Sequence, residues 1–287
     1  MELKKTILVT GATGALGRSL ISYLRRNKYI KIIALSKKNT VENSYVVDIL
    51  NEAEVTEAIA THKPDLIFHL AATFVHDLNL SIKVNLLTSV SILEAIKKQN
   101  LPIRLVLIGS AAEYGIVTED ENPICEDHNL APVSIYGLTK SWQSDLVNYY
   151  ACNGVDVVLA RIFNLMGDNI SSQLLVGRLM NQIAQFKRNE RTNIELGPLN
   201  AIRDYISLED ACEQLLLIAN KGSSGQIYHV ASGKPILMRD LVLKFLKTHG
   251  ISTSKLIEAE HLTNHSGIDV PIMYADTSKT MNLFNKK

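Results

Sequence analysis

The chain has 287 residues, enough to bury a substantial core in one large α/β unit or in a domain with a smaller lobe. Its 30 Lys and Arg residues balance 29 Asp and Glu residues, and no basic block stands out, so neither a nucleic-acid partner nor an anionic membrane surface is indicated. No signal-peptide core or apolar run of about 20 residues is present, and the three cysteines are widely spaced without a metal-ligand pattern; we therefore expect a cytoplasmic protein with reduced thiols and no metal.

The first predicted elements are a buried strand at residues 6–9 and a helix at 15–26, joined by a glycine-rich loop. Gly11 permits a tight turn, Gly14 lets the backbone approach a pyrophosphate, and Gly17 lets the helix pack on the strand. The start of the helix adds amide donors for an anion. The loop predicts a bound dinucleotide, with contacts from Gly11, Thr13, Gly14, Ala15, Leu16, Gly17 and Arg18.

The second predicted strand, at residues 30–35, ends where the adenosine ribose of such a cofactor would lie. It is followed by Ser36, Lys37 and Lys38, with no carboxylate to hold the 2′-hydroxyl of NAD. Basic residues suit the 2′-phosphate of NADP, so we expect NADP(H), while NAD(H) remains possible. The alternative is that Lys37 and Lys38 form a solvated loop.

A short strand at residues 45–47 is predicted next, and it is followed by Asp48 and Ile49. We expect both residues at the cofactor, where Asp48 is placed to accept a hydrogen bond from the adenine amine.

Two further predicted strands deliver polar and small residues to the same edge of a sheet. Residues 65–70 form a buried strand that ends at Leu70 and is followed by Ala71 and Ala72, and residues 81–98 repeat apolar positions with helical spacing. The strand at 103–108 ends at Gly109 and Ser110. Open α/β sheets bind ligands at the carboxyl ends of their strands, so Ser110 is well placed to act.

A helix predicted from Tyr136 to Cys152 places Lys140 one turn after the tyrosine, with side-chain origins about 5–6 Å apart. A free tyrosine has a pKa near ~10. An adjacent ammonium lowers that pKa and makes Tyr136 a usable general acid or base. Such a spacing is common by chance, but together with the glycine loop it predicts a catalytic group of Ser110, Tyr136 and Lys140.

The rest of the chain predicts a strand at 155–162 and then a weaker alternation of elements. These are helices at 174–188, from 207 onward and at 238–248, with short strands at 193–196 and 227–230. The fold class is α/β: a doubly wound parallel sheet with a smaller C-terminal α/β substrate lobe. We assign residues 1–163 to the dinucleotide-binding domain, with 201–225 returning to it, and 164–200 and 226–287 to the smaller lobe. The cleft between them is the expected substrate site.

These motifs, in this order, resemble extended short-chain dehydrogenase/reductases of the nucleotide-sugar type, which have a Rossmann-type fold. The resemblance covers nearly the whole chain. It is carried by the glycine loop, Asp48, His69 to Ala72, Asn85, the Ser110 segment, Tyr136 and Lys140, Arg161 to Gly167, and Arg203 to Tyr205. Within that family, the stretches 108–115, 134–140 and 196–205 are most similar to GDP-4-dehydro-6-deoxy-mannose reductases, which reduce a 4-keto sugar.

The resemblance implies that Tyr136 protonates the sugar C4 oxygen as hydride arrives from the nicotinamide. Ser110 would hydrogen-bond that oxygen, and Lys140 would bind the nicotinamide ribose. It further implies cofactor contacts from Leu70, Ala71, Ala72 and Asn85, and substrate contacts from Ser110, Ala111, Asn164, Arg178 and Arg203, with Ser134 as a further option. Asn164 and Arg203 would hold the diphosphate, since a guanidinium suits two phosphate oxygens at once.

Each of these residues also has a purely structural interpretation. Ser110 would then cap a strand end, Lys140 would lie on a solvated helix face, and Asn164 would be a turn residue. Arg203 would form an ion pair with Asp204 or Glu209. His69 is predicted to be a packed strand-end histidine, and His76, Asp77 and Glu113 are weaker candidates to approach the substrate.

Two alanines narrow the reaction that the resemblance implies. Dehydratases of this superfamily carry an Asp-Glu pair where this chain has Ala111 and Ala112, and fucose-type epimerase-reductases carry a cysteine at the second position. Alanine moves no proton, so simple reduction or C4 epimerisation remains. The arginine expected near 264–271 to grip the nucleotide is missing, which leaves the base open. The chain also ends before the family's usual final segment.

The leading prediction is therefore an NADP(H)-dependent 4-ketoreductase acting on a nucleotide-diphosphate 6-deoxy sugar. Its alternatives are an NAD-dependent nucleotide-sugar 4-epimerase, a reductase of a small ketone or aldehyde, and a non-catalytic dinucleotide-sensing regulator. Family members commonly pair through helices that correspond to 81–98 and 136–152, so the resemblance also implies a homodimer.

Overall fold

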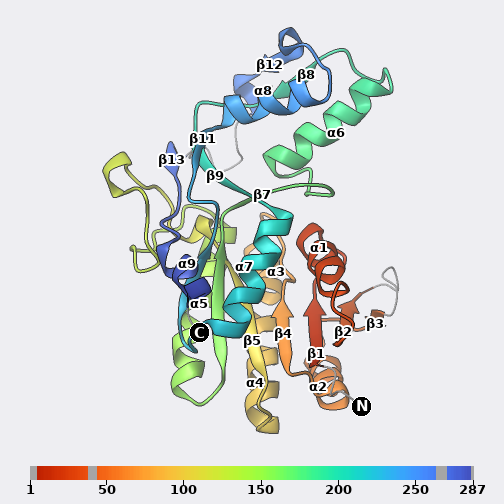
Figure 1. Ribbon diagram of the computed structural model, residues 1–287, viewed down its shortest axis with the longest axis vertical. Coiled ribbons are helices and arrows are strands. Elements are labelled where there is room, and N and C mark those ends of the chain that lie inside the picture. Colours follow the sequence, from red (N-terminus) through yellow and green to blue (C-terminus); the bar gives the residue numbers. More distant parts are fainter. Residues whose placement is uncertain (1–4, 38–43, 263–269, 286–287) are drawn as a thin grey trace.

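The computed structural model describes residues 5–37, 44–262 and 270–285. A large sheet covered by helices forms its lower part, and a smaller set of short strands and helices lies above it (Figure 1). Some of the predictions from the sequence concern Lys38 and the segment 264–271. Lys38 and most of that segment lie outside the described residues.

The large sheet has seven strands in the order β10-β6-β5-β4-β1-β2-β3, and all of their pairings are parallel. Strands β4 and β6 are buried along their whole length, as expected for a parallel sheet with both faces covered. The direction of winding reverses between β1 and β4, which is where open α/β sheets bind their ligands. The strands are β1 Lys5–Thr10, β2 Ile30–Ser36, β3 Ser44–Val46, β4 Leu66–His69, β5 Arg104–Ser110, β6 Val157–Ile162 and β10 Ile227–Val230.

Helices cover both faces of this sheet, and alternate strand residues serve the two faces. Ile7 and Val9 of β1 belong to the core beneath α1, α7 and α9, whereas Leu8 belongs to the core beneath α2, α4 and α5. The predicted doubly wound α/β fold is confirmed. The helices are α1 Ala15–Leu24, α2 Glu52–His62, α4 Thr88–Gln99, α5 Ile135–Cys152, α7 Leu208–Lys221 and α9 Ser278–Asn285.

The helix that the sequence predicts at 81–98 is not one regular α-helix. It begins as α3 (Leu78–Ser81), widens into a π-helical turn at Ile82–Leu87, and continues as α4. Asn85 lies within the widened turn, and its side chain bonds to the chain outside the helix. π-helical turns occur often at functional sites, and this one borders the loop that leaves β4.

The upper part contains two small sheets and two long helices. In one sheet, β9 (Ile202–Ser207) pairs with β7 (Asn164–Met166), β11 (Pro235–Leu237) and β13 (Ile272–Met273). The other pairs β8 (Ile194–Leu196) with β12 (Leu256–Glu258). Helices α6 (Leu175–Lys187) and α8 (Met238–Thr248) pack on β8 through a separate core that includes Leu179, Ile194 and Leu246. Short 3₁₀ turns occur at Ala111–Glu113, Glu119–Glu121, Thr253–Lys255 and Glu260–Leu262.

The segment 226–285 differs from the predicted division into lobes. Strand β10 pairs with β6 at the edge of the large sheet, and Leu283 of α9 packs into the core beneath α1 and α7. The chain thus crosses from the upper part back to the large sheet after β9, into α7 and β10, and again after β13, into α9. Both returns depend on contacts between residues far apart in the chain, which local periodicity does not report.

Candidate active site

Steric requirements at two of its three glycines shape the loop between β1 and α1. Gly11 has a positive φ of 64°, and a Cβ atom there would lie 2.7 Å from the backbone nitrogen of Ala71. A Cβ atom on Gly17 would lie 2.3 Å from the carbonyl oxygen of Gly11. At Gly14 the corresponding approach is 3.4 Å, an ordinary contact. Packing therefore requires glycine at 11 and 17, whereas Gly14 leaves the exposed side of the loop open.

The first turn of α1 meets this loop without a side-chain cap. Gly14 is the N-cap, and Ala15 and Leu16 follow it as the first helical residues. The guanidinium of Arg18 donates from Nε to the carbonyl oxygen of Thr13 at 2.8 Å and braces the loop. Uncapped amides at a helix start attract anions, so these residues fit the pyrophosphate of a dinucleotide.

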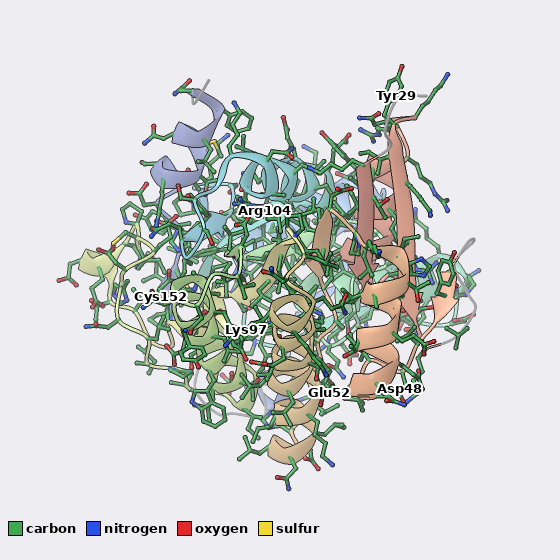
Figure 2. All side chains as sticks on the ribbon, turned by 90° about the horizontal axis from the view of Figure 1, so that it is seen from below. Tyr29, Asp48, Glu52, Lys97, Arg104 and Cys152 are labelled. Atoms are coloured by element: carbon green, nitrogen blue, oxygen red, sulfur yellow. The ribbon has the colours of Figure 1, made fainter. Side chains whose placement is uncertain are left out.

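The residues predicted at the adenosine end lie together beside the edge of the sheet. Ser36 ends β2 and is buried, whereas Lys37 is exposed and places Nζ 3.4 Å from Oδ2 of Asp48. Asp48 comes shortly before α2, which begins at Glu52 (Figure 2). Ile49 is half-buried and packs against the α2–α4–α5 core. Two residues predicted for the phosphate and the adenine thus form an exposed ion pair with each other.

Ser110, Tyr136 and Lys140 converge at the carboxyl end of β5. Ser110 is the last residue of that strand, and it hydrogen-bonds to the hydroxyl of Tyr136. Tyr136 is the second residue of α5, whose N-cap Ser134 accepts the amide of Gly137 at 3.0 Å. The ammonium of Lys140 lies 6.0 Å from the centre of the Tyr136 ring. Ser134, predicted as a possible substrate contact, is engaged in starting the helix.

The Lys140 side chain is buried and fixed by two protein acceptors. Nζ donates to the carbonyl oxygen of Ile108 at 2.8 Å and to Oε1 of Gln143 at 2.9 Å. An ammonium has three N–H donors, so one remains for another partner. Gln143 in turn donates from Nε2 to Ser89 at 2.7 Å. The solvated helix face that the sequence left as an alternative for Lys140 is therefore wrong.

Burial dominates the electrostatics of this group. It lowers the pKa of Lys140 to about 8, against the opposing effect of Glu113. Burial also raises the pKa of Tyr136 above its usual value, and the hydrogen bond from Ser110 offsets only part of that rise. The sequence predicted a lowered tyrosine pKa. The structure gives the opposite direction, because the cost of burying a phenolate exceeds the help available to it.

An aromatic contact beside Tyr136 was not predicted from the sequence. Phe74, on the loop after β4, places its ring centre 4.4 Å from that of Tyr136 with an interplanar angle of 39°. Phe74 is also one of the exposed large apolar side chains. It therefore shields one side of the phenol while presenting apolar surface outward.

The loop after β4 carries the residues predicted to line the cofactor. Leu70 and Ala71 are half-buried and Ala72 is exposed, which leaves them accessible at the ligand-binding edge. Asn85 is buried instead. Its Oδ1 accepts the amide of Thr73 at 2.8 Å, and its Nδ2 donates to Thr139 at 2.9 Å. Asn85 thus joins this loop to the helix that bears Tyr136.

His69 is the packed strand-end histidine that the sequence predicted. Its two ring nitrogens lie 2.8 Å from the hydroxyl of Thr10 and 3.1 Å from that of Thr88. Burial, together with the positive charge of Lys140, lowers its pKa to about 3, so the ring stays neutral.

The predicted substrate residues belong mostly to the upper part of the molecule. Asn164 on β7 and Arg203 on β9 lie on neighbouring strands, and Asn164 donates from Nδ2 to the carbonyl oxygen of Asp204 at 2.9 Å. Arg203 donates from Nη1 to the carbonyl oxygen of Ile202 at 2.9 Å. Arg178 is half-buried on α6. Ala111, next to Ser110, is buried in a small cluster with Phe163 and other apolar residues.

Asp204 and Glu209, which the sequence offered as ion-pair partners of Arg203, both contact other residues as well. Oδ1 of Asp204 accepts the amide and hydroxyl of Ser232, and Oδ2 accepts the amides of Gly233 and Ala275. Glu209 pairs with Arg26 at 2.8 Å. Asp204 therefore joins β9 to the segments that follow β10 and β13. The sequence did not predict these contacts because they join residues far apart in the chain.

Over the described ranges, no helix is long and apolar enough to cross a membrane. Within the same ranges, no group of three or more His, Cys, Asp or Glu side chains gathers that could hold a metal ion.

Comparison with known sequences places these features in a family context. The sequence model of the NAD dependent epimerase/dehydratase family matches residues 7–231. The GDP-6-deoxy-D-talose 4-dehydrogenase of Aggregatibacter actinomycetemcomitans is 28% identical over 282 residues, which cover 96% of this chain and 90% of that protein. The GDP-6-deoxy-D-mannose reductase of Pseudomonas aeruginosa is 26% identical over 249 residues, covering 84% and 79%. The UDP-glucose 4-epimerase of Mycoplasma genitalium is 29% identical over 248 residues, covering 75% and 71%.

A solved structure gives the same architecture. RMD from Pseudomonas aeruginosa, complexed with NADPH, superposes with a TM-score of 0.85 at 21% identity, over 99% of this chain and 92% of that one. The resemblance that the motifs predicted, to extended short-chain dehydrogenase/reductases of the GDP-6-deoxy-mannose reductase type, is confirmed by these matches.

Proposed function

The chain belongs to the NAD dependent epimerase/dehydratase family, and from this premise we propose that it reduces the 4-keto group of a nucleotide-linked 6-deoxy sugar with NADPH. One observation carries the proposal: Ser110, Tyr136 and Lys140 meet at the carboxyl end of β5, on the same edge of the sheet as the glycine loop. The relatives named GDP-6-deoxy-D-talose 4-dehydrogenase and GDP-6-deoxy-D-mannose reductase support a reaction of this kind.

The reaction uses the protonation states that burial favours. When bound, NADPH supplies the hydride that attacks C4. Tyr136, whose raised pKa keeps it protonated at neutral pH, gives its proton to the C4 oxygen. The Ser110 hydroxyl donates a hydrogen bond to the same oxygen and stabilises the charge that develops there. The remaining N–H of Lys140 serves a ribose hydroxyl, and its charge favours the phenolate left on Tyr136.

The residues after Ser110 favour reduction over elimination. Ala111 and Ala112 stand where the resemblance would place the acid and base of a dehydratase, and Ala111 is buried. Neither side chain can protonate a leaving hydroxyl at C6. The product therefore keeps the carbon skeleton of the substrate and differs from it by two hydrogen atoms.

The preference for NADPH over NADH is assigned to Lys37. Its ion pair with Asp48 spans 3.4 Å between exposed side chains, and such pairs contribute only about 0–1 kcal/mol. Lys37 can therefore leave Asp48 at little cost to meet a 2′-phosphate. Asp48 is then free to accept from the adenine amine.

The nucleotide diphosphate is assigned to Asn164 and Arg203, which lie on neighbouring strands above the large sheet. Arg178, on α6 in the upper part, is a further cation that would contact the nucleotide. Remote binding of this kind orients a small keto sugar against Ser110 and Tyr136.

The test is to incubate the pure protein with NADPH and a panel of 4-keto nucleotide sugars, following the absorbance of reduced nicotinamide. We expect one NADPH to be consumed for each sugar reduced, with a GDP-linked 6-deoxy sugar among the substrates. No consumption with any member of the panel would contradict the proposal. A 4-keto sugar without a nucleotide serves as the control for the diphosphate contacts.

A second candidate is a nucleotide-sugar 4-epimerase, which the similarity to a protein named UDP-glucose 4-epimerase favours. An epimerase retains its cofactor between two hydride transfers. NAD that copurifies with the protein, together with interconversion of UDP-sugars and no net use of NADPH, would support this candidate in place of reduction.

Exposed apolar side chains on the π-helical turn and on α5 support a homodimer. Leu87 in the π-helical turn and Trp142 and Tyr149 of α5 are 48%, 36% and 58% exposed, on helices that pack side by side. Large apolar side chains left exposed to solvent favour association. Light scattering should give twice the chain mass for the protein and the single mass for a Trp142→Glu/Tyr149→Lys variant. A wild-type monomer would contradict the dimer.

A further inference from the structure

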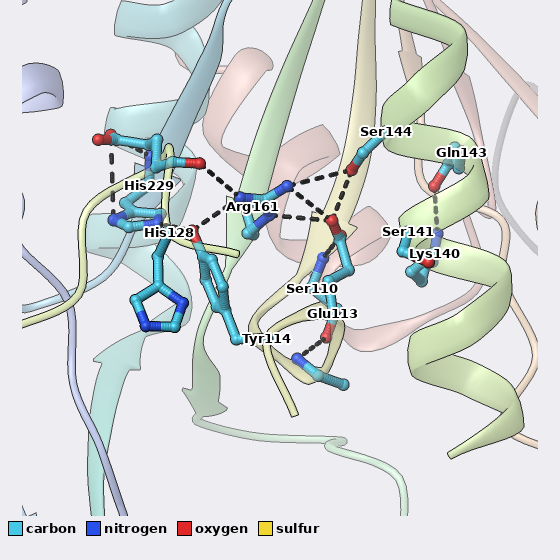
Figure 3. Close-up of polar contacts among 12 residues, drawn as sticks. Ser110, Glu113, Tyr114, His128, Lys140, Ser141, Gln143, Ser144, Arg161 and His229 are labelled. Carbon is cyan, nitrogen blue, oxygen red and sulfur yellow. Dashed lines mark hydrogen bonds and ion pairs between the residues drawn. The ribbon is translucent and has the colours of Figure 1, made fainter. Parts of the chain in front are cut away.

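Glu113 and Arg161 form a buried ion pair next to Ser110, the candidate catalytic serine (Figure 3). Arg161 of β6 places Nη2 2.8 Å from Oε2 of Glu113, and its Nε donates to the same oxygen at 3.0 Å. Both side chains are at most 1% exposed. Burying two charges is costly, and a pair of apolar residues often stabilises a fold equally well. The pair therefore calls for a role other than stability.

The second oxygen of Glu113 holds the peptide that carries Ser110. Oε1 accepts the backbone N–H of Ser110 at 2.6 Å, and the Ser110 hydroxyl oxygen accepts the amide of Ala112 at 3.2 Å. These reciprocal bonds close the 3₁₀ turn at Ala111–Glu113. Because the acceptor is charged, the bond to Ser110 is short and strong. Glu113 thus fixes where strand β5 ends and where the serine hydroxyl begins.

The same carboxylate also reaches the helix that carries Tyr136 and Lys140. The hydroxyl of Ser144, one turn after Lys140, donates to Oε2 of Glu113 at 2.5 Å. Nη2 of Arg161 lies 3.3 Å from that hydroxyl as well. Glu113 and Arg161 therefore join three elements, namely the end of β5, strand β6 and helix α5 (Figure 3).

The far side of the guanidinium is equally constrained. Nη1 of Arg161 donates to the hydroxyl of Tyr114 at 2.7 Å and to the carbonyl oxygen of Glu126 at 3.0 Å. The Tyr114 hydroxyl lies 2.5 Å from Nε2 of His229 on β10. A planar guanidinium held at each of its nitrogens has one available orientation, so it presents Glu113 in one position.

We propose that Glu113, held by Arg161, is a positioning residue that sets the separation between Ser110 and the helix of Tyr136 and Lys140. It touches neither cofactor nor substrate. It acts by keeping the serine hydroxyl and the phenol on the same carbonyl oxygen, where a small misplacement is costly to the rate. The expected effect on kcat rests on the proposed function, whereas the role of Glu113 in holding Ser110 in place does not.

The decisive variant replaces both charges. Glu113→Gln alone leaves the buried guanidinium unpaired and is expected to destabilise the fold. The double variant Glu113→Gln/Arg161→Met removes both charges, so we expect it to fold with a midpoint of unfolding near that of the wild type. Its kcat should nevertheless fall about tenfold or more, while its KM for NADPH changes by less than twofold. A merely structural pair predicts a stable variant with full activity.

The matched control is Arg104→Gln, at the opposite end of the same strand. Arg104, labelled in Figure 2, lies 3.2 Å from Asp156 in a partly buried ion pair, and it is the first residue of β5 whereas Ser110 is the last. Its loss should affect stability and leave kcat within twofold of the wild type.

A readout without substrate separates this inference from the proposed function. Hydrogen exchange at the Ser110 amide should be about tenfold faster in the double variant than in the wild type, and unchanged in Arg104→Gln. An unchanged exchange rate in the double variant overturns the proposal, and so does a kcat within twofold of the wild type. If the wild type reduces none of the 4-keto sugars, the proposed function fails, and the exchange rate alone decides the role of Glu113.

Discussion

The two ends of the ligand-binding edge differ in how far their charged side chains are buried and fixed by hydrogen bonds. At one end, Lys140 is buried and held by two protein acceptors, and Tyr136 is shielded by Phe74. At the other end, Lys37 and Asp48 form an exposed pair 3.4 Å apart. A buried polar group is expensive to misplace, whereas an exposed ion pair contributes little. Under the proposed function, the reacting groups are therefore held firmly at the first end, and the second end affects only the choice between NADPH and NADH.

The largest effect should come from Tyr136→Phe, which breaks the first end at its reacting atom. The ring and its contact with Phe74 remain, but the proton is lost. We expect kcat to fall roughly 10²–10⁴-fold, the range for lost general-acid catalysis. Steady-state rates with the best 4-keto sugar would measure it, alongside NADPH binding by fluorescence, which should hardly change. Unaltered turnover would remove Tyr136 from the proton path.

The charge of Lys140 should leave a pH signature in stability. Burial lowers its pKa from 10.5 to about 8, so the folded protein releases this proton before the unfolded chain does. Below pH 8 the buried charge lowers stability by about 3 kcal/mol, taking ~1.4 kcal/mol per pKa unit, and this deficit disappears as the pH rises toward 10.5.

Urea unfolding of the wild type and of Lys140→Met at pH 7 and pH 10 tests this signature. The variant should gain stability relative to the wild type at pH 7, and the gap should narrow at pH 10. Lys37→Met, which alters an exposed lysine, should show no such narrowing. A gap that does not depend on pH would mean that Lys140 titrates normally.

Two glycines of one loop should separate packing from ligand binding. In Gly17→Ala the new Cβ would meet the carbonyl oxygen of Gly11 at 2.3 Å, so we expect a loss of about 1–3 kcal/mol in unfolding free energy. In Gly14→Ala the approach is 3.4 Å, so stability should hold while NADPH binds more weakly. Thermal unfolding with and without NADPH distinguishes them. Equal stability losses would refute the distinction.

The smallest effect should come from the exposed end. Lys37→Ala should raise KM for NADPH by about 2–5-fold and leave KM for NADH nearly unchanged, since only NADPH carries the 2′-phosphate. Lys31→Ala, at the other end of β2 and also exposed, is the control. Equal changes for both cofactors would mean that Lys37 never meets the phosphate.

The sequence predicted what depends on short stretches of chain. The glycine spacing predicted the β1–α1 loop because Gly11 has a positive φ and a Cβ at Gly17 would meet the carbonyl oxygen of Gly11 in the same loop. The tyrosine–lysine spacing predicted one helix face because four residues make about one turn. Strand ends placed Ser110 on the ligand-binding edge for the same local reason.

The rest depends on residues that meet only after folding. Glu113 was a weak substrate candidate, but its partner Arg161 is 48 residues away, on a different strand. β10 and α9 join the large sheet through contacts with β6 and α7, which no local period encodes. The raised pKa of Tyr136 likewise follows from burial, and burial is a property of the packed molecule.

The central claim is that hydride and proton reach one carbonyl group at Ser110 and Tyr136. NADPH deuterated at C4 of its nicotinamide, incubated with the reducible 4-keto sugar and followed by NMR, tests it directly. We expect one deuterium at C4 of the product sugar per NADPH oxidised, and almost none with Tyr136→Phe over the same time. NADPH oxidised without deuterium at that carbon, or equal labelling by the variant, would contradict the account.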